Sequence, residues 1–243
     1  MRKILMNLNS ATERLETFYR VNKHIEGVER FSAIEGKGLR SSLKESGLLL
    51  SGEADERYTN GALGCALSHA EQWRRAVSSG EALTVIEDDA VFCKNFEEEH
   101  KRLLKTLPET WDFILWGYNL DVPLSYQVFP GSAYNVTLFE KTALQQNIDL
   151  WSNTCISGRV FKLFRTFGLF CYSVSPHGAK KLLEFCFPIR AMRVNVPGYI
   201  DLQPNGGIDI AMSALYPEIE SYVCMPPLVV APENKETSQT LHN

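Results

Sequence analysis

Three adjacent carboxylates, Glu87-Asp88-Asp89, interrupt an otherwise apolar part of the chain. Residues 83–86 before them and 90–92 after them are mainly apolar, a composition typical of a buried strand. Like charges repel and burial penalises each charge further, so a bound cation or hydrogen-bond donors must offset the cost. We expect Mg²⁺ or Mn²⁺ here, because these ions prefer oxygen ligands and are commonly held by one or two carboxylates and substrate phosphates. The alternative is an acidic run that begins a solvated loop.

The two outer carboxylates of the triplet are expected to act on the same ligand. In an extended strand successive side chains point to opposite faces, so Glu87 and Asp89 share a face while Asp88 points away. This geometry allows two carboxylates to bind one metal ion, or one to bind a metal and the other a ribose.

A long helix directly precedes the carboxylate strand and carries Ser68 and His69. Apolar residues recur from Ala62 at helical spacing, and Ser79-Gly80 is typical of a helix end. His69 lies on the apolar stripe of this helix, which indicates a core histidine that holds the helix against the sheet. A residue that lines a ligand pocket fits the same pattern, so both interpretations stay open.

Two strands near the N-terminus are expected to bring more polar residues to the same sheet edge. Residues 3–8 and 29–34 have strand character, and the capping-box pattern Ser10-Ala-Thr-Glu13 predicts a helix between them. A strand-helix-strand unit of this length indicates a parallel sheet, which binds ligands at the carboxyl ends of its strands.

Asn7, Asn9 and Arg14 lie at the end of the first strand and in the first turns of its helix, and Glu35 follows the second strand. Amide groups at a helix start and an arginine suit a uracil or a diphosphate. An N-cap with a surface arginine explains the first three residues equally well.

The rest of the chain alternates helix-like and strand-like segments. Segments 37–60 and 117–160 lack clear periodicity, and we expect a surface excursion and an active-site excursion there. The alternation predicts an α/β fold with a mixed, mostly parallel sheet flanked by helices, in a single domain over residues 1–243. We expect helices at 96–107, 176–185 and 206–216, and strands at 112–116, 167–174 and 219–225.

Composition narrows the class of protein. The net charge of -4 and the pI near 5.8 argue against bulk electrostatic capture of nucleic acid. The six cysteines are far apart, without a CxxC pair or zinc-ligand spacing, so we expect reduced thiols. The apolar stretch before Asn7 is too short for a signal peptide, and no run approaches the roughly 18 apolar residues of a membrane helix. We therefore expect a cytoplasmic protein.

Five stretches carry a resemblance to a known family, and they follow one another in the family's order. The most specific are Gly-x-x-Gly-Cys-x-x-Ser-His and the Glu-Asp-Asp triplet. The chain resembles glycosyltransferase family 25, the bacterial lipooligosaccharide glycosyltransferases whose relatives include collagen galactosyltransferases. The stretches are 6–9 with Glu13-Arg14, 30–36, 61–69, 85–90 and 172–182.

The resemblance implies a GT-A fold, which is Rossmann-like, and transfer from a nucleotide sugar with inversion at the anomeric carbon. The triplet resembles the DxD element of such enzymes, with Asp89 as a direct ligand of Mn²⁺ or Mg²⁺. Glu87 or Asp88 would lie near the ribose or a metal-bound water. Ser68 and His69 would line the donor or acceptor pocket.

The resemblance also implies the substrates. The donor would be a UDP-sugar, with UDP-galactose favoured, and the acceptor a lipid-linked lipooligosaccharide or lipopolysaccharide core saccharide. We expect residues 1–116 to bind the donor and 117–243 to bind the acceptor. Glu35 stands where the family usually has aspartate, so its longer side chain must make the nucleotide contact.

An inverting transfer needs a base that takes the proton of the acceptor hydroxyl. Asp209 is the first candidate, because Gly206-Gly207 before it allow close approach to a sugar and a long loop precedes it. A helix cap would explain this aspartate too. Asp201 is the alternative base. Because some GT-A enzymes place a C-terminal histidine on the metal, His242 is a further possible ligand.

Rival functions are a metal-dependent phosphohydrolase or nucleotidyltransferase and a non-catalytic binder of nucleotide sugars or carbohydrates. The first would need more carboxylates or histidines at other strand ends. Basic clusters at 74–75, 101–105, 180–181 and 190–193 suggest peripheral association with the inner membrane of a Gram-negative bacterium, although solvated helix faces explain them as well.

Overall fold

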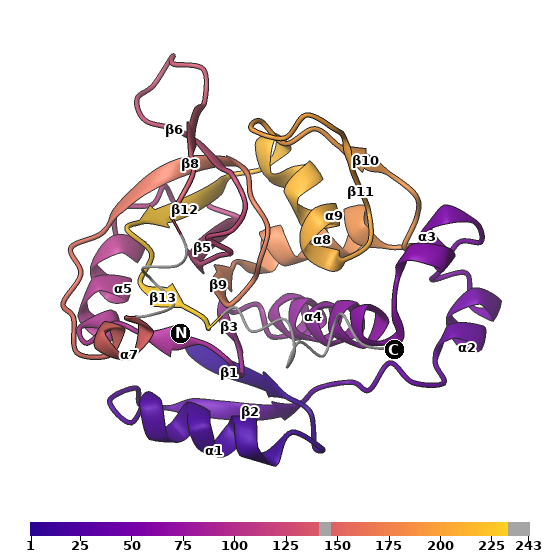
Figure 1. The fold of residues 1–243 in the computed structure, drawn as a ribbon, viewed down its shortest axis with the longest axis horizontal. Coiled ribbons are helices and arrows are strands. Elements are labelled where there is room, and N and C mark those ends of the chain that lie inside the picture. The colour runs from indigo at the N-terminus through magenta and orange to yellow at the C-terminus, as the bar shows by residue number, and fades with distance from the viewer. Residues whose placement is uncertain (141–146, 233–243) are drawn as a thin grey trace.

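A mixed sheet of nine strands forms the centre of the molecule (Figure 1), in a computed structural model that describes residues 1–140 and 147–232. The strand order is β2-β1-β3-β9-β5-β12-β8-β6-β7. These strands are β1 Arg2–Asn7, β2 Val28–Ser32, β3 Leu83–Glu87, β5 Phe113–Gly117, β6 Leu124–Gln127, β7 Asn135–Thr137, β8 Arg159–Arg165, β9 Cys171–Val174 and β12 Ser221–Met225. Two separate pairs are β4 Val91–Phe92 with β13 Val229–Val230, and β10 Arg193–Val194 with β11 Gln203–Pro204.

Strand directions confirm a mixed α/β fold but correct the expectation of a mostly parallel sheet. β1 is parallel to β2 and β3, and β5 is parallel to β12. β9 is antiparallel to both of its neighbours, β3 and β5, and the pairs β12–β8, β8–β6 and β6–β7 are antiparallel too. The sequence could not show this, because an apolar run predicts a buried strand without its direction.

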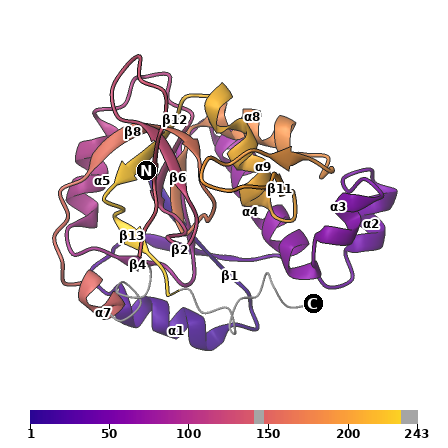
Figure 2. The same cartoon turned by 45° about the horizontal axis from the view of Figure 1, so that its top comes forward.

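Helices cover both faces of the sheet (Figures 1 and 2). α4 (Asn60–Ser79), α8 (Pro176–Cys186) and α9 (Ile208–Leu215) pack on one face, and α1 (Thr12–Val21) and α5 (Phe96–Leu104) pack on the other. The alternation of side chains along β3 supplies both cores, because Val85 packs on the α4 side and Ile86 on the α1 side. β3 ends at Glu87, and Asp88 and Asp89 lie in the turn that follows, which the Ala90 N–H closes on the Glu87 carbonyl at 3.2 Å. The expectation of an extended strand through the whole triplet is therefore wrong.

The helix predicted from Ala62 is confirmed as α4, which begins slightly earlier. The Thr59 side chain caps it by accepting the Ala62 N–H at 3.0 Å, and Gly80 ends it in the left-handed conformation, at φ 68°. The predicted capping box of the first helix is wrong. The N-cap of α1 is Ala11, which makes no side-chain cap bond, and the Ser10 hydroxyl donates to Glu35 at 3.0 Å instead.

The two segments without periodicity contain short elements. α2 (Arg40–Glu45) and α3 (Glu53–Arg57) form an excursion beyond the N-terminal end of α4 (Figure 2). The second segment contributes β6, β7 and α7 (Ile148–Trp151), so part of it extends the central sheet. The strand predicted at 167–174 is confirmed only in its second half, as β9. A short 3₁₀ turn, Tyr216–Glu218, follows α9.

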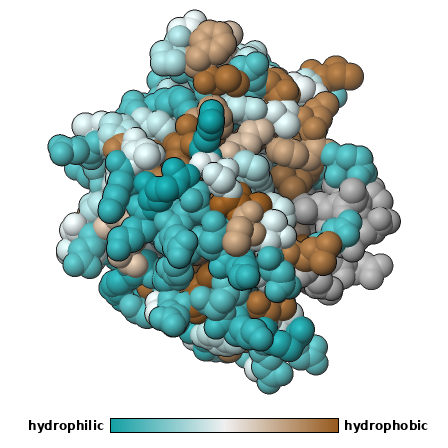
Figure 3. All heavy atoms as spheres, turned by 90° about the vertical axis from the view of Figure 1, so that its left-hand side faces the viewer, coloured by the Kyte–Doolittle hydropathy of each residue, from teal (hydrophilic) through white to brown (hydrophobic). Residues whose placement is uncertain are grey.

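The outer surface is mostly polar on the side that carries α5 (Figure 3), and apolar side chains gather near the tip of the β6–β7 hairpin. Val128, Phe129 and Tyr134 are exposed at this tip. Within the described ranges, none of the helices combines the length and the apolar character needed to span a membrane. Each cysteine is a free thiol, as expected.

Candidate active site

A pocket of about 470 Å³ lies where β1 and β3 end and α9 begins. Because β1 and β3 are parallel, their last residues, Asn7 and Glu87, reach the same edge of the sheet. The acidic triplet and Arg14 line this side of the pocket, and Asp209 lines it from α9. Since β9 lies between β3 and β5, the two predicted halves share one sheet as well as this pocket.

Asp88 is the fully paired member of the triplet. It lies in the turn after β3, its side chain is 8% exposed, and it points toward Asn7 and Arg14. Oδ2 accepts the Asn7 Nδ2–H at 2.7 Å, and Oδ1 accepts the Arg14 Nε–H at 2.9 Å and a second bond from the same guanidinium. The positive charge that offsets Asp88 therefore comes from a protein side chain, Arg14.

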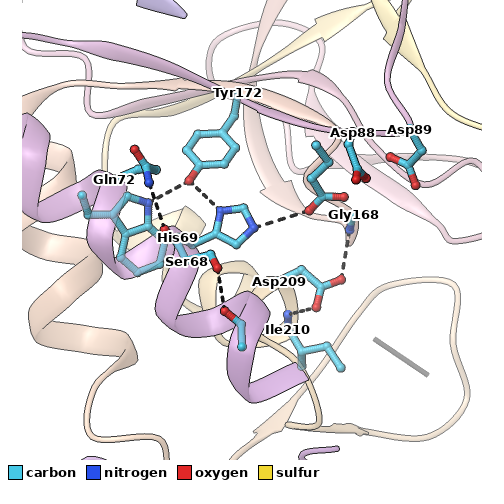
Figure 4. A network of polar contacts seen from close by, with 12 residues as sticks. Ser68, His69, Gln72, Asp88, Asp89, Gly168, Tyr172, Asp209 and Ile210 are labelled. Atoms are coloured by element: carbon cyan, nitrogen blue, oxygen red, sulfur yellow. Dashed lines mark hydrogen bonds and ion pairs between the residues drawn. The ribbon is translucent and has the colours of Figure 1, made fainter. Parts of the chain in front are cut away.

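Glu87 points to the opposite face and meets a buried polar network (Figure 4). The Trp73 Nε1–H donates to the Tyr172 hydroxyl at 2.9 Å, and that hydroxyl lies 2.9 Å from His69 Nδ1. The other ring nitrogen, Nε2, is 3.4 Å from Glu87 Oε1. Burial raises the pKa of the Tyr172 phenol well above its ordinary value, so this hydroxyl stays neutral. His69 thus fits both interpretations, as a core histidine that also reaches a pocket carboxylate.

Asp89 has the least satisfied carboxylate of the three. Oδ2 lies 3.2 Å from the Arg14 guanidinium, whereas Oδ1 is buried and has no hydrogen-bond partner among the described residues. Burial, and then the charge of Glu87, raise the pKa of Asp89 from 3.8 to about 7, although Arg14 opposes this shift. A buried carboxylate oxygen without a partner is costly, and a bound cation would relieve that cost.

Asp209 faces the triplet from the other side of the pocket (Figure 4). Its carboxylate accepts the Gly168 N–H at 3.1 Å and the Ile210 N–H at 2.9 Å. Burial raises the pKa of Asp209, and these two donors oppose the rise. The N-cap of α9 is Gly207, so Asp209 is not the N-cap, although it lies in the first turn of the helix and accepts the Ile210 N–H there. A pocket carboxylate with a raised pKa is suited to accept a proton.

Ser68 joins α4 to the loop after β2. Its hydroxyl accepts the Ile34 N–H at 2.8 Å and donates to the Gly64 carbonyl at 2.8 Å. The backbones meet closely here, because a Cβ on Gly64 would lie 2.4 Å from the Ile34 carbonyl oxygen and a Cβ on Gly36 would lie 1.6 Å from that of Asn60. Two glycines of the family-like stretches are therefore explained by close packing at the wall of the pocket.

The other predicted site residues divide into those that line the pocket and those that do not. Asn7 and Ser68 are lining residues with hydrogen-bonded side chains. Asn9 is exposed, and its side chain accepts bonds from Arg30 and Ser32. Glu35 bonds to Ser10. Asp201 lies on an exposed loop, and His242 falls outside the described residues.

Sequence reasoning missed three polar lining residues: Cys65, Asn119 and Asp121. Cys65 was noted among six scattered thiols and within a family-like stretch, but was given no role at the site, although it lies one helical turn before His69. Asn119 and Asp121 follow the buried strand β5, and the strand-end rule that pointed to Asn7 would also have found them. They were hidden because they fall in the segment that lacked periodicity.

Asp89 fits the hard divalent cation expected from the sequence. Its unpartnered Oδ1 is an oxygen ligand at the pocket, which is what Mg²⁺ and Mn²⁺ prefer. Glu87, on the same pocket wall, is the second candidate ligand, and Asp88 is occupied by Arg14 and Asn7. Asp89 and Glu87 therefore remain the predicted pair of metal ligands.

Comparisons with known proteins agree with the resemblance. A family model described as Glycosyltransferase family 25 (LPS biosynthesis protein) matches residues 1–196. A protein of Acanthamoeba polyphaga mimivirus named "Putative glycosyltransferase R655" is 32% identical over 122 residues, which are 49% of this chain and 37% of that protein. A Rattus norvegicus protein named "Probable inactive glycosyltransferase 25 family member 3" is 39% identical over 95 residues, 35% of this chain and 17% of that protein.

The chain thus spans well under half the length of these relatives. Among solved structures, one titled "Crystal Structure of A197 from STIV" covers 92% of this chain and 81% of its own, at 14% identity and a TM-score of 0.39. A mannose-1-phosphate geranyltransferase from Thermus thermophilus covers 74% of this chain and 44% of its own, at 12% identity and a TM-score of 0.32. Both likenesses are too distant to bear on function.

Proposed function

Because this chain belongs to glycosyltransferase family 25, we propose that it transfers a hexose from a nucleotide sugar to a saccharide acceptor, with inversion at the anomeric carbon. The proposal includes a GT-A type fold. One observation carries it: the same pocket holds Asp89, with a buried unpartnered oxygen, and Asp209, with a raised pKa. Two carboxylates in different environments suit two different tasks.

The donor side of the proposed reaction lies at the ends of β1 and β3. Asp88 holds the Arg14 guanidinium in place, and Asn7 in turn donates a hydrogen bond to Asp88. Arg14 also lies 3.2 Å from Asp89, so positive charge is available at the pocket wall for a diphosphate. Asp89, with Glu87, would hold Mn²⁺ or Mg²⁺, which would supply positive charge to a departing nucleoside diphosphate.

The acceptor side of the proposed reaction depends on Asp209. As the acceptor hydroxyl oxygen attacks the anomeric carbon, its proton passes to the Asp209 carboxylate and the bond to the donor diphosphate breaks. The Gly168 and Ile210 N–H groups fix the carboxylate, at 3.1 and 2.9 Å, so that it can receive the proton in one orientation. Asp201 is a weaker candidate, because it lies on an exposed loop outside the pocket lining.

For the donor we propose UDP-galactose, and for the acceptor a lipooligosaccharide or lipopolysaccharide core saccharide carried on lipid. The family description, which names LPS biosynthesis, supports the acceptor class. The sugar itself rests on the family resemblance alone. A thermal-shift panel of UDP-galactose, UDP-glucose and the two UDP-N-acetylhexosamines, with and without Mn²⁺, tests the donor. We expect the largest stabilisation with UDP-galactose and Mn²⁺; absence of a shift with every UDP-sugar would contradict the proposal.

A transfer assay then separates the proposed function from its rivals. A transferase releases UDP only when a saccharide acceptor is present, and the product gains the mass of a hexose. A phosphohydrolase cleaves the diphosphate with water and releases UMP and the sugar phosphate without an acceptor. A non-catalytic binder, the rival to which the name of the rat relative points, shows the thermal shift with no UDP release.

We also propose that a lipid-linked acceptor brings the protein to the cytoplasmic face of a membrane. The basic clusters add little support, because several of their side chains have local acidic partners. Arg102 pairs with Glu99 at 2.6 Å and Lys181 with Asp112 at 2.7 Å. Binding to anionic liposomes at low salt tests this proposal, and absence of binding would remove it.

A further inference from the structure

Cys65, His69 and Glu87 form a cluster of potential metal ligands on the α4 side of the pocket. Cys65 and His69 are four residues apart on α4, so they lie on the same face of the helix, and Glu87 ends β3 on the face that packs against α4. The cysteine sulfur, an imidazole nitrogen and a carboxylate oxygen all lie within 4.8 Å of one another. Asp89 is not a member of this cluster.

The second ring nitrogen of His69 is a further observation. His69 is fully buried, and its Nε2 lies 3.4 Å from Glu87 Oε1 but makes no hydrogen bond among the described residues. The ring is held in this orientation by Tyr172, which stacks on it at a centroid distance of 5.6 Å and contacts Nδ1 at 2.9 Å. A buried imidazole nitrogen close to a carboxylate, and within 4.8 Å of a thiol sulfur, is suited to bind a cation.

The surroundings of His69 match those of metal-bound histidines. Such histidines usually donate their second ring N–H to a nearby acceptor, which fixes the tautomer and the ring. The Tyr172 hydroxyl already accepts the Trp73 Nε1–H at 2.9 Å, and a hydroxyl oxygen has two acceptor positions. It can therefore accept the His69 Nδ1–H as well, which leaves the Nε2 lone pair free for a metal.

We propose that Cys65, His69 and Glu87 form a three-ligand site for Zn²⁺. A thiolate, an imidazole and a carboxylate are the donor set that zinc takes, whereas Mg²⁺ and Mn²⁺ prefer oxygen ligands alone. The Cys65 thiol releases its proton to solvent as the zinc–sulfur bond forms. Three protein ligands would leave a fourth position for water or substrate, and two of the three ligands, Cys65 and Glu87, line the pocket.

This site goes beyond the proposed transfer reaction and does not depend on it. The zinc site uses softer ligands than the proposed Mn²⁺ or Mg²⁺ site at Asp89. Glu87 is the one residue that belongs to both sites. Sequence reasoning excluded zinc by looking for pairs of cysteines. The cluster escaped that search because its third ligand is on a strand, 18 residues after His69.

Cobalt titration tests the site directly, because Co²⁺ replaces Zn²⁺ and a cobalt–thiolate bond gives a charge-transfer band in the near ultraviolet. With the metal-free protein we expect this band to saturate at one equivalent of Co²⁺ and to vanish when Zn²⁺ is added. Cys65→Ser should lose the band, and His69→Gln should raise the Co²⁺ dissociation constant by at least roughly tenfold. Cys155→Ser, at an exposed cysteine, is the matched control and should keep the band.

A second measurement uses the unmodified protein and so does not depend on the folding of a variant. Zn²⁺ should slow alkylation of Cys65 severalfold, as followed by peptide mass spectrometry, and should leave alkylation of Cys155 unchanged. The proposal is overturned if the wild-type protein gives no cobalt–thiolate band, if Cys65→Ser keeps it at full intensity, or if Zn²⁺ leaves the alkylation rate of Cys65 unchanged.

Discussion

Asp88 and Asp89 are adjacent in the chain but lie in opposite environments. Asp88 has bonds from Asn7 and Arg14 on both of its oxygens. The Oδ2 of Asp89 lies 3.2 Å from a nitrogen of the same guanidinium. Its Oδ1 is buried and has no hydrogen bond in the described structure. Asp88 is thus electrostatically compensated, and Asp89 is compensated only in part.

This difference separates carboxylates that hold the fold from carboxylates that await a ligand. Removing a paired, buried carboxylate leaves its partner without a compensating charge. Removing an incompletely paired carboxylate instead relieves the protein of a desolvation penalty. The same reasoning places Asp209, with its raised pKa, among the groups available for chemistry. Variants of the first class should therefore lose stability, and variants of the second class should lose catalysis or ligand binding.

Asp209→Asn should have the largest effect of the changes considered. We expect it to lower the turnover rate without changing the other properties measured. Removal of a general base lowers the rate roughly 10²- to 10⁴-fold, while an amide of the same size should keep the fold and the binding of UDP-sugar. Steady-state kinetics and donor thermal shifts measure the two properties. Asp201→Asn, on the exposed loop, is the matched control and should turn over normally. Normal turnover in Asp209→Asn together with loss in Asp201→Asn would reverse the assignment of the base.

Asp88→Ala should damage the fold more than any other change at the triplet. The substitution removes the carboxylate that accepts hydrogen bonds from Arg14 and Asn7. Breaking a buried ion pair in this way costs about 3 kcal/mol of unfolding free energy. Urea denaturation measures the loss. Asp89→Ala is the comparison, and it should unfold at the same urea concentration as the wild type or higher. Equal destabilisation by both substitutions would break the contrast between the two sides.

The stability difference between the wild type and Asp89→Asn should depend on pH. The pKa of Asp89 is raised from 3.8 to about 7 in the folded state, so the folded protein holds a proton that the unfolded chain releases between these values. The wild type therefore loses stability, relative to the variant, as the pH rises through this window. Melting temperatures in metal-free buffer at pH 5 and pH 8 measure the effect. If the difference in melting temperature between the two proteins is the same at pH 5 and pH 8, the raised pKa of Asp89 is contradicted. Arg14 limits how far this pKa is raised.

Ser68→Ala should have the smallest effect, a loss of about 1 kcal/mol in unfolding free energy. The substitution removes the acceptor of the Ile34 N–H and the donor to the Gly64 carbonyl, both at 2.8 Å. Chemical denaturation gives the value. We expect the donor-induced thermal shift to persist, since the role seen for Ser68 is to join α4 to the loop after β2. Loss of donor binding without loss of stability would instead make Ser68 a ligand contact.

Much of the N-terminal fold could be predicted from the sequence, because periodicity and local caps are short-range signals. The strand at Leu83–Glu87 and the helix that ends at Gly80 are examples. The direction of β9 and the pairing of β6 and β7 could not be predicted, since they depend on contacts between segments that are far apart.

The residues of the candidate site could be predicted from the sequence better than the contacts between them. Strand ends and the acidic triplet identified Asn7, Asp89 and Asp209, which all line the pocket. That Arg14 binds Asp88, and leaves Asp89 incomplete, is a matter of tertiary geometry. The capping-box motif misled for a similar reason, because Ser10 found a partner in Glu35 across the chain.

The central claim is that Asp89, and not Asp88, holds the divalent cation used with the donor. Isothermal titration of UDP into the protein, with and without saturating Mn²⁺, tests it most directly in the wild type, Asp89→Asn and Asp209→Asn. We predict that Mn²⁺ tightens UDP binding in the wild type and in Asp209→Asn, and has no effect on UDP binding in Asp89→Asn. An undiminished Mn²⁺ effect in folded Asp89→Asn would contradict the account.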